Sequence, residues 1–224
     1  MDFKMSNSDQ KIINFDHEKN FNDEDYYISN ANKHIYDLLN DWPKWEKNFL
    51  NISGEKFSGK SHLINIFIKK FGGFQINSKN FRNDDLIKVK NFKNIILEDI
   101  NKEIDEKLFF TLINIIEQND KYLITTSKLP IVNFDFDLID LKSRAKNFLL
   151  QNIEKPDDEL MFALILKNLS DRQIMINRKL IEYSIKRIDR SYGKIFEFIY
   201  KIDEMSLKKK EPINFKIIKE ILGE

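Results

Sequence analysis

The sequence predicts an α/β protein in which a parallel sheet, covered by helices on both faces, is followed by a small all-helical region. Two observations support this fold class. Up to residue 154, short apolar runs alternate with helical stretches, which is typical of buried parallel strands joined by helices. After the Lys-Pro-Asp-Asp segment at 155–158, only helical periodicity follows. We therefore expect a mobile polar tail at residues 1–20, an α/β domain at 21–154 and a helical domain at 155–224.

The expected elements follow from these patterns in chain order. A first helix is expected at 29–41, where Ser29 or Asn30 provides a cap and apolar residues recur at helical spacing. Strands are expected at 48–52, 73–76, 94–97 and 122–126. Further helices are expected at 60–71, 106–118, 159–169, 178–187, 192–207 and 215–222. Pro156 and Asp157 mark the start of the helical domain, because both residues favour a first helical turn.

The composition excludes several classes of protein. The chain has 37 Lys and Arg residues against 36 Asp and Glu residues, so its net charge of +1 does not indicate a strongly basic surface for DNA. The absence of cysteine excludes disulfides, thiolate catalysis and cysteine-based zinc sites. The three histidines have no ligand-like spacing. No apolar stretch is long enough to span a bilayer, so we expect a soluble cytoplasmic protein without a membrane partner.

One motif stands out between an expected strand and an expected helix. The segment from Gly54 to Ser61 matches G-x-x-x-x-G-K-[ST], a loop whose backbone N–H groups surround phosphate oxygens at a helix N-terminus. In this arrangement the lysine reaches the terminal phosphates and the serine hydroxyl binds Mg²⁺. The sequence therefore predicts binding of ADP or ATP with Mg²⁺. The predicted contacts within the loop are Gly54, Phe57, Ser58, Gly59, Lys60 and Ser61.

A pair of acidic residues follows the expected strand at 94–97. Glu98 and Asp99 emerge at the carboxyl end of that strand, where ligands bind in open parallel sheets. One acid would face the metal and the other the attacking water. We take Glu98 as the metal ligand beside Ser61 and Asp99 as the catalytic acid, although the order Glu-Asp inverts the commoner order and leaves this assignment open. Hydroxyls at 125–127 could also lie near the γ-phosphate.

These motifs, in this order and with a helical domain after them, resemble AAA+ P-loop ATPases of the DnaA branch. The segment YYISNANKHIY at 26–36 resembles the adenine pocket of that family, which implies contacts from Tyr27 and Ile28. GKSHLINIF resembles the start of the helix that follows the phosphate-binding loop in that family, which implies that His62 also contacts the nucleotide. LKSRAKNFLL at 141–150 resembles the box with the arginine finger, which implies that Arg144 acts on a neighbouring subunit's nucleotide. The residues from 155 resemble the family's helical lid domain.

The tail and the end of the chain favour a regulatory branch of that family. The chain ends after the expected lid, so we expect no sequence-specific DNA-binding module. In this it is similar to the Hda-type proteins, which inactivate DnaA after replication starts. QKIINF at 10–15 resembles their peptide for the replicative sliding clamp, which implies contacts from Gln10, Ile13 and Phe15. The resemblance thus implies DnaA and the clamp as partners, and a homodimer is possible.

Two departures from the family's pattern concern hydrolysis. Ser127 stands where the family usually has an aspartate, its first sensor residue. Gly193 stands where the family has a sensor arginine that reaches from the lid to the nucleotide, and Lys194 and Arg190 are possible substitutes for that arginine. We therefore expect weak intrinsic ATPase activity and stable nucleotide binding. The preferred function is stimulation of hydrolysis of DnaA-bound ATP through Arg144. The alternatives are an ATP-driven remodeller similar to helicase loaders, and an adaptor in which the nucleotide only stabilises the fold.

Overall fold

The computed structural model describes residues 26–209 and 211–224. Within these residues five strands form one sheet in the order β2-β3-β4-β1-β5, and every neighbouring pair is parallel. The strands are β1 (Phe49–Ser53), β2 (Phe74–Asn77), β3 (Asn94–Ile100), β4 (Tyr122–Ser127) and β5 (Leu149–Asn152). β1 and β4 are buried along almost their whole length, because helices cover both faces of the sheet. The predicted fold class is confirmed.

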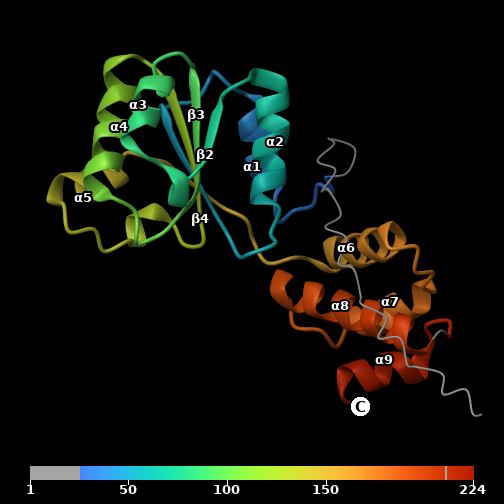
Figure 1. The fold of residues 1–224 in the computed structure, drawn as a ribbon. Coiled ribbons are helices and arrows are strands. Elements are labelled where there is room, and N and C mark those ends of the chain that lie inside the picture. The colour runs from blue at the N-terminus through green and yellow to red at the C-terminus, as the bar shows by residue number, and fades with distance from the viewer. Residues whose placement is uncertain (1–25, 210) are drawn as a thin grey trace, which may run out of the picture.

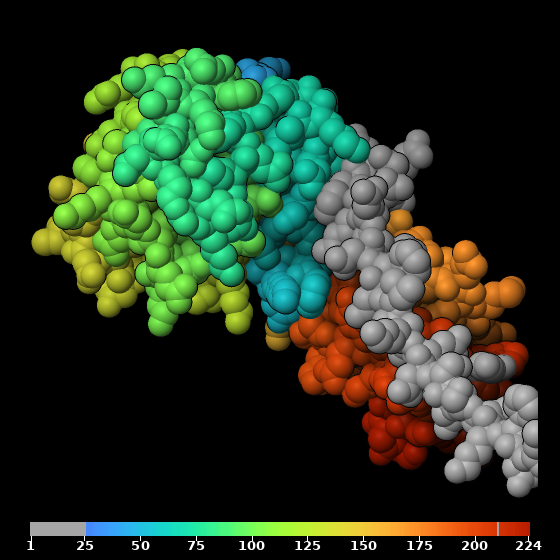
Figure 2. All heavy atoms as spheres, viewed as in Figure 1, coloured from blue at the N-terminus to red at the C-terminus, as the bar shows by residue number. Residues whose placement is uncertain are grey.

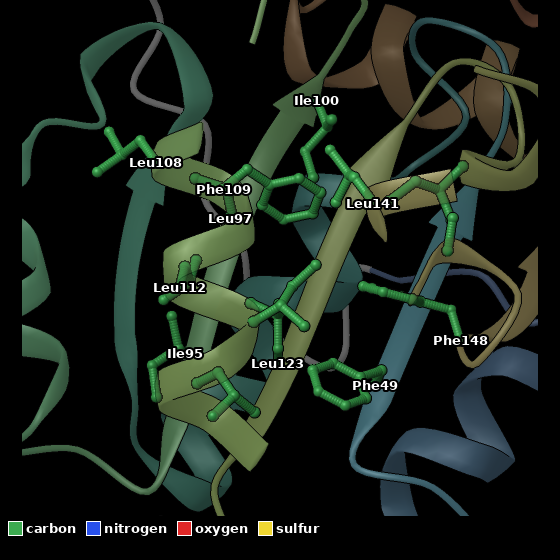
Figure 3. Close-up of a cluster of buried hydrophobic side chains, with 14 of the residues drawn as sticks. Phe49, Ile95, Leu97, Ile100, Leu108, Phe109, Leu112, Leu123, Leu141 and Phe148 are labelled. Atoms are coloured by element: carbon green, nitrogen blue, oxygen red, sulfur yellow. The ribbon is translucent and has the colours of Figure 1, made fainter. Parts of the chain in front are cut away.

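Helices cover the two faces of this sheet (Figure 1). On one side lie α1 (Lys33–Asn40) and α2 (Lys60–Phe71), and on the other lie α3 (Asn83–Val89), α4 (Glu106–Gln118) and α5 (Ile139–Ala145). Alternation along each strand sends successive side chains to opposite faces. Figure 3 shows the cluster on the α4 side, where Phe109 and Leu112 pack toward Leu97 and Leu123 of the sheet.

The chain then forms a separate group of helices with its own core. These are α6 (Asp158–Asp171), α7 (Arg178–Ile185), α8 (Tyr192–Lys209) and α9 (Phe215–Leu222). Asp157 caps α6, because its side chain accepts a hydrogen bond from the Leu160 backbone N–H. Tyr192, at the start of α8, and Leu160 of α6 are buried in the cluster that includes residues of α1 and α2. The first turn of α8 is therefore a contact point between the two parts.

Several elements differ from the expectation. The elements α3, α5 and β5, together with two short 3₁₀ turns at Ser78–Asn80 and Ile131–Asn133, were not predicted. β3 continues to Ile100 through a bulge, so the acidic pair lies inside the strand and not after it. The first helix begins at Lys33 with Asn32 at the N-cap, so the predicted cap at Ser29 or Asn30 was wrong. Ser29 and Asn32 instead form a turn, since the Ser29 N–H donates to Asn32 Oδ1 at 2.9 Å.

The described part of the chain contains no helix that combines the length and the apolar character needed to cross a membrane.

Candidate functional site

The predicted phosphate-binding loop connects β1 to α2. Gly59 is its last residue and has a φ of 93°, a left-handed conformation that glycine adopts without strain. A Cβ atom at this position would lie 3.1 Å from Cε2 of Tyr26, so the close approach of that ring also requires glycine. The helix α2 begins at the next residue, which directs its positive dipole end toward the loop.

Phe57 has an unusual backbone conformation within the loop. Its φ is 70°, which costs a bulky side chain on the order of 1–3 kcal/mol. The ring does not fold into the loop but packs on Phe196 of α8, with ring centroids 4.8 Å apart. The loop is therefore held in a strained shape by a contact with the helical part.

Lys60 lies at the centre of the loop. Its Nζ atom donates to the carbonyl oxygens of Gly54 and Glu55 at 2.8 Å and 2.7 Å, and to Ser58 Oγ at 3.4 Å. Burial lowers the pKa of Lys60, and the charges of Asp99, Glu98 and Glu55 oppose that effect. The structure thus brings Lys60 and both acids of β3 into one electrostatic environment.

The two acids of β3 have different surroundings. Glu98 Oε2 accepts a hydrogen bond from Gln75 Nε2 at 2.8 Å, whereas Glu98 Oε1 is buried without a hydrogen-bond partner in the described part of the chain. Glu98 follows Ile96, which packs in the α2-side core, by two residues, so its side chain faces the loop side of the sheet. A buried carboxylate oxygen without a partner is costly unless a ligand or cation completes it.

Asp99 is fixed by its neighbours. It lies at the bulge with a φ of 57°, a conformation that aspartate tolerates better than most residues. Its backbone N–H donates to Thr126 Oγ1 at 2.9 Å, and its carbonyl accepts from the Ser78 hydroxyl at 2.7 Å. Its carboxylate accepts from Asn77 Nδ2 at 2.9 Å. Two residues of β2 that face the same side of the sheet, Gln75 and Asn77, thus hold the acidic pair.

The remaining predicted nucleotide contacts lie around the loop. Ser58 is buried, Ser61 is exposed in the first turn of α2, and His62 packs edge-on against Tyr26 with ring centroids 5.1 Å apart. Tyr27 and Ile28, which are 45% and 41% exposed, do not bury their side chains against the loop. The residue that does is Tyr26, which sequence reasoning missed.

Tyr26 is partly buried, and its solvent-shielded hydroxyl has no hydrogen-bond partner among the described residues. Desolvation of the ring is the main reason why its pKa is raised. Its aromatic neighbour Tyr36 is stacked at a centroid distance of 6.3 Å. This places a polar atom with unused hydrogen-bonding capacity beside the last glycine of the loop.

The hydroxyls at the end of β4 divide between the two faces of the sheet. Thr125 and Ser127 point away from the loop and accept hydrogen bonds from Asn51 Nδ2, each at 3.0 Å. Asn51 Oδ1 accepts from the backbone N–H of Ile131 at 3.0 Å. Only Thr126 lies on the loop side, where it contacts Asp99. Of the three hydroxyls expected near the γ-phosphate, only that of Thr126 therefore faces the loop side of the sheet.

The predicted arginine finger and the two basic residues considered as sensor substitutes all form ion pairs within the chain. Arg144, on α5, forms an ion pair with Glu117 of α4, and both side chains are about one-third exposed. Arg190 pairs with Asp158 at 2.7 Å, and Lys194 pairs with Glu197 at 2.9 Å. The helix α5, which carries Arg144, lies on the α4 side of the sheet, whereas the loop leads into α2 on the other side (Figure 1).

The predicted clamp-binding residues Gln10, Ile13 and Phe15 lie outside the described residues.

Comparison with known proteins shows what the chain is similar to. No family model matches it. It is 25% identical over 205 residues to the chromosomal replication initiator protein DnaA of Buchnera aphidicola subsp. Cinara cedri, covering 79% of this chain and 46% of that protein. It is 20% identical over 198 residues to DnaA of Clavibacter sepedonicus, covering 78% and 42%. The chain therefore spans about half the length of the curated relatives it matches.

Solved structures agree on the fold. Domain III of Thermotoga maritima DnaA has a TM-score of 0.71 at 17% identity, covering 91% of this chain and 95% of that chain. AMPPCP-bound DnaA from Aquifex aeolicus has a TM-score of 0.64 at 20% identity, covering 84% and 68%. A variant of Thermotoga maritima RuvB has a TM-score of 0.62 at 12% identity, covering 79% and 62%. The chain is a distant sequence relative of DnaA and has the AAA+ fold of DnaA domain III.

Proposed function

We propose that the chain binds ADP or ATP at the loop between β1 and α2. The observation that carries this proposal is the placement of Lys60, whose partly buried Nζ atom lies among the loop carbonyls and near Glu98 and Asp99. A phosphate group entering the loop would replace carbonyl oxygens with anionic ones, which are stronger acceptors for a lysine. The AMPPCP complex of Aquifex aeolicus DnaA, which has the same fold, supports the proposal.

Mg²⁺ fits the same site. Ser61 provides an exposed hydroxyl at the start of α2, and Glu98 provides the buried oxygen that has no protein partner. Among the described residues, no group of three or more histidine and acidic side chains could hold a metal on its own. This agrees with Mg²⁺, which is commonly held by one or two protein oxygens together with nucleotide phosphates. When bound there, Mg²⁺ would neutralise phosphate charge.

The site supports stable nucleotide binding with weak intrinsic hydrolysis. The carboxylate of Asp99, proposed to act in hydrolysis, already accepts a hydrogen bond from Asn77, and the Asp99 backbone forms hydrogen bonds with Thr126 and Ser78. A carboxylate engaged in this way is a poorer acceptor for the proton of an attacking water. Ser127 faces the opposite side of the sheet, so it offers no contact to a terminal phosphate. Arg190 and Lys194 are both paired within the helical part.

The proposed role is that of an Hda-type regulator, which docks on the sliding clamp and stimulates hydrolysis of DnaA-bound ATP. Sequence similarity to DnaA and the fold of its domain III support DnaA as the partner. Arg144 would be the group supplied in trans. An arginine of this kind contributes about 10³–10⁵ in rate by stabilising charge on the transferring phosphoryl group. The tail residues Gln10, Ile13 and Phe15 would provide the clamp contact.

The experiment is hydrolysis of DnaA-bound ATP in the presence of this protein, with and without DNA-loaded clamp. We expect the clamp to raise the rate, and we expect Arg144→Ala and the triple alanine variant at Gln10, Ile13 and Phe15 each to abolish the stimulation. Lys142→Ala is the matched control, because Lys142 lies on the same helix and pairs only with the exposed Asp135. Absence of stimulation together with rapid ATP turnover by the protein alone would favour the remodeller instead.

A further inference from the structure

The phosphate-binding loop is held from outside by the first turns of α8. The backbone N–H of Tyr192 donates to Glu55 Oε2 at 2.9 Å, and the ring of Phe57 packs on Phe196 with centroids 4.8 Å apart. Glu55 and Phe57 lie between Gly54 and Gly59, at positions where the motif accepts any residue. In Figure 2 the cyan spheres of the loop region meet the orange-red spheres of α8. The contact thus joins the loop to a helix more than 130 residues later.

Glu55 acts as a cap for α8. The first N–H groups of a helix have no partner within the helix, and the positive end of the helix dipole attracts a carboxylate. Tyr192, which carries one of these groups, is only 2% exposed. Its hydroxyl donates to the carbonyl oxygen of Glu154 at 3.1 Å, and the N–H of Glu154 donates to Ala31 at 3.0 Å. The start of α8 is therefore anchored to the sheet part as well as to the loop.

Phe57 makes the contact sensitive to the shape of the loop. Its φ of 70° is unfavourable for an aromatic residue, so the loop would leave this conformation without a compensating contact. The ring of Phe196, tilted by 30° to that of Phe57, is the partner that compensates. Any change of the loop that moves Phe57 must also change its packing on α8.

We propose that Glu55 and Phe57 are positioning residues through which α8 holds the loop in its nucleotide-binding shape. Nucleotide affinity and the seating of the helical part then depend on each other, because coupling between two equilibria is reciprocal. This inference rests on the proposed nucleotide binding, and it deepens that proposal by naming the side chains through which α8 sets the shape of the loop.

The test measures both sides of the coupling. The chain has no cysteine, so Lys107→Cys on α4 and Lys186→Cys after α7 introduce a single pair of spin labels at exposed positions. ADP affinity is measured by calorimetry, and the label distance is measured with and without ADP. The proteins are the otherwise unchanged chain, Phe196→Ala, Glu55→Ala, Lys60→Ala and Lys201→Ala. Lys201 is the matched control, since it lies on α8 and pairs with Glu197 away from the loop.

We expect Phe196→Ala and Glu55→Ala to weaken ADP binding by about tenfold, within the usual range of coupling between sites. ADP should narrow the distance distribution in the unchanged chain and in Lys201→Ala, and it should do so less in the two loop-contact variants. A merely structural role for Glu55 and Phe196 would not remove this response to ADP.

Two results would overturn the inference. One is ADP affinity within twofold of the unchanged chain in both variants, and the other is a distance distribution that ADP does not alter. If Phe196→Ala does not fold, Glu55→Ala decides the matter, because that side chain lies outside the hydrophobic cores. Failure of the unchanged chain to bind ADP, or equal binding by Lys60→Ala, would overturn the proposed nucleotide binding as well.

Discussion

Two polar clusters lie on opposite faces of the central strands, and they differ in how completely their hydrogen bonds are satisfied. The buried cluster consists of Asn51, Thr125 and Ser127 on the α4 side. The loop-side cluster consists of Lys60, Glu98, Asp99 and Thr126 on the α2 side. Both use strand residues of β3 or β4, so the difference is not one of secondary structure.

In the buried cluster each polar group has a partner. Asn51 donates to two hydroxyls and accepts from Ile131, and Ser127 donates to the carbonyl oxygen of Leu129 at 2.6 Å. In the loop-side cluster Glu98 Oε1 has no partner, Asp99 has a positive φ, and burial lowers the pKa of Lys60. A satisfied network stabilises the fold, whereas strain and unused hydrogen-bonding capacity are typical of sites where a ligand binds, as proposed for the loop-side cluster.

The largest expected effect on nucleotide binding comes from a substitution in the loop-side cluster. Lys60→Ala should weaken binding of ADP and ATP by about 100-fold, because it removes charge-assisted hydrogen bonds worth roughly 3 kcal/mol together. The free energy of unfolding should change by less than about 1 kcal/mol, since removal of a desolvated cation offsets its lost hydrogen bonds. Calorimetry and urea unfolding measure the two effects. Lys47→Ala, at an exposed lysine before β1 and outside the loop, is the control.

The opposite outcome is expected for the buried cluster. Asn51→Ala should lower the free energy of unfolding by about 2–4 kcal/mol, because Thr125, Ser127 and the Ile131 N–H each lose a buried partner. Nucleotide affinity should change far less than in Lys60→Ala. Urea unfolding is the measurement, and the exposed Asn119→Ala is its control. A loss below about 1 kcal/mol would remove the contrast between the clusters.

The smallest effect sharpens the contrast at one atom. Glu98→Gln replaces the carboxylate, whose Oε1 atom has no partner, by an amide. An amide binds Mg²⁺ less strongly than a carboxylate does. The gain in ATP affinity on adding Mg²⁺ should fall by about tenfold, or 1.4 kcal/mol, while affinity without Mg²⁺ should stay the same or rise. Titrations with and without Mg²⁺ measure this gain. Glu103→Gln, in the exposed loop after β3, should leave it unchanged.

Long elements with many buried apolar positions could be predicted from the sequence. α2 and α4 have the predicted bounds, because each buries four or more apolar residues at helical spacing. α5 buries only Leu141 and Ala145, which is too few to reveal a period. β5 is a four-residue edge strand whose residues are all at least partly accessible, so it lacks the apolar run of a central strand.

The candidate site divides in the same way. The loop motif and the acidic pair are each a continuous stretch of the sequence, and the residue types and their spacing indicate phosphate and metal binding. Tyr26, Gln75 and Asn77 could not be assigned from the sequence, because their contacts with Gly59, Glu98 and Asp99 depend on which strands and segments are neighbours. The bulge in β3 was also hidden, since charged residues within a strand read as its end.

The sequence by itself determined the parallel α/β architecture, the change to an all-helical region after residue 154, and the position of the phosphate-binding motif. These follow from hydrophobic periodicity and from local backbone requirements, which act over a few residues. Only the tertiary structure decided which face each hydroxyl of β4 takes, which acid has a buried oxygen without a partner among the described residues, and that Glu55 and Phe57 contact α8. Such contacts join residues far apart in the chain, and burial and competition for hydrogen bonds choose among them once the fold has formed.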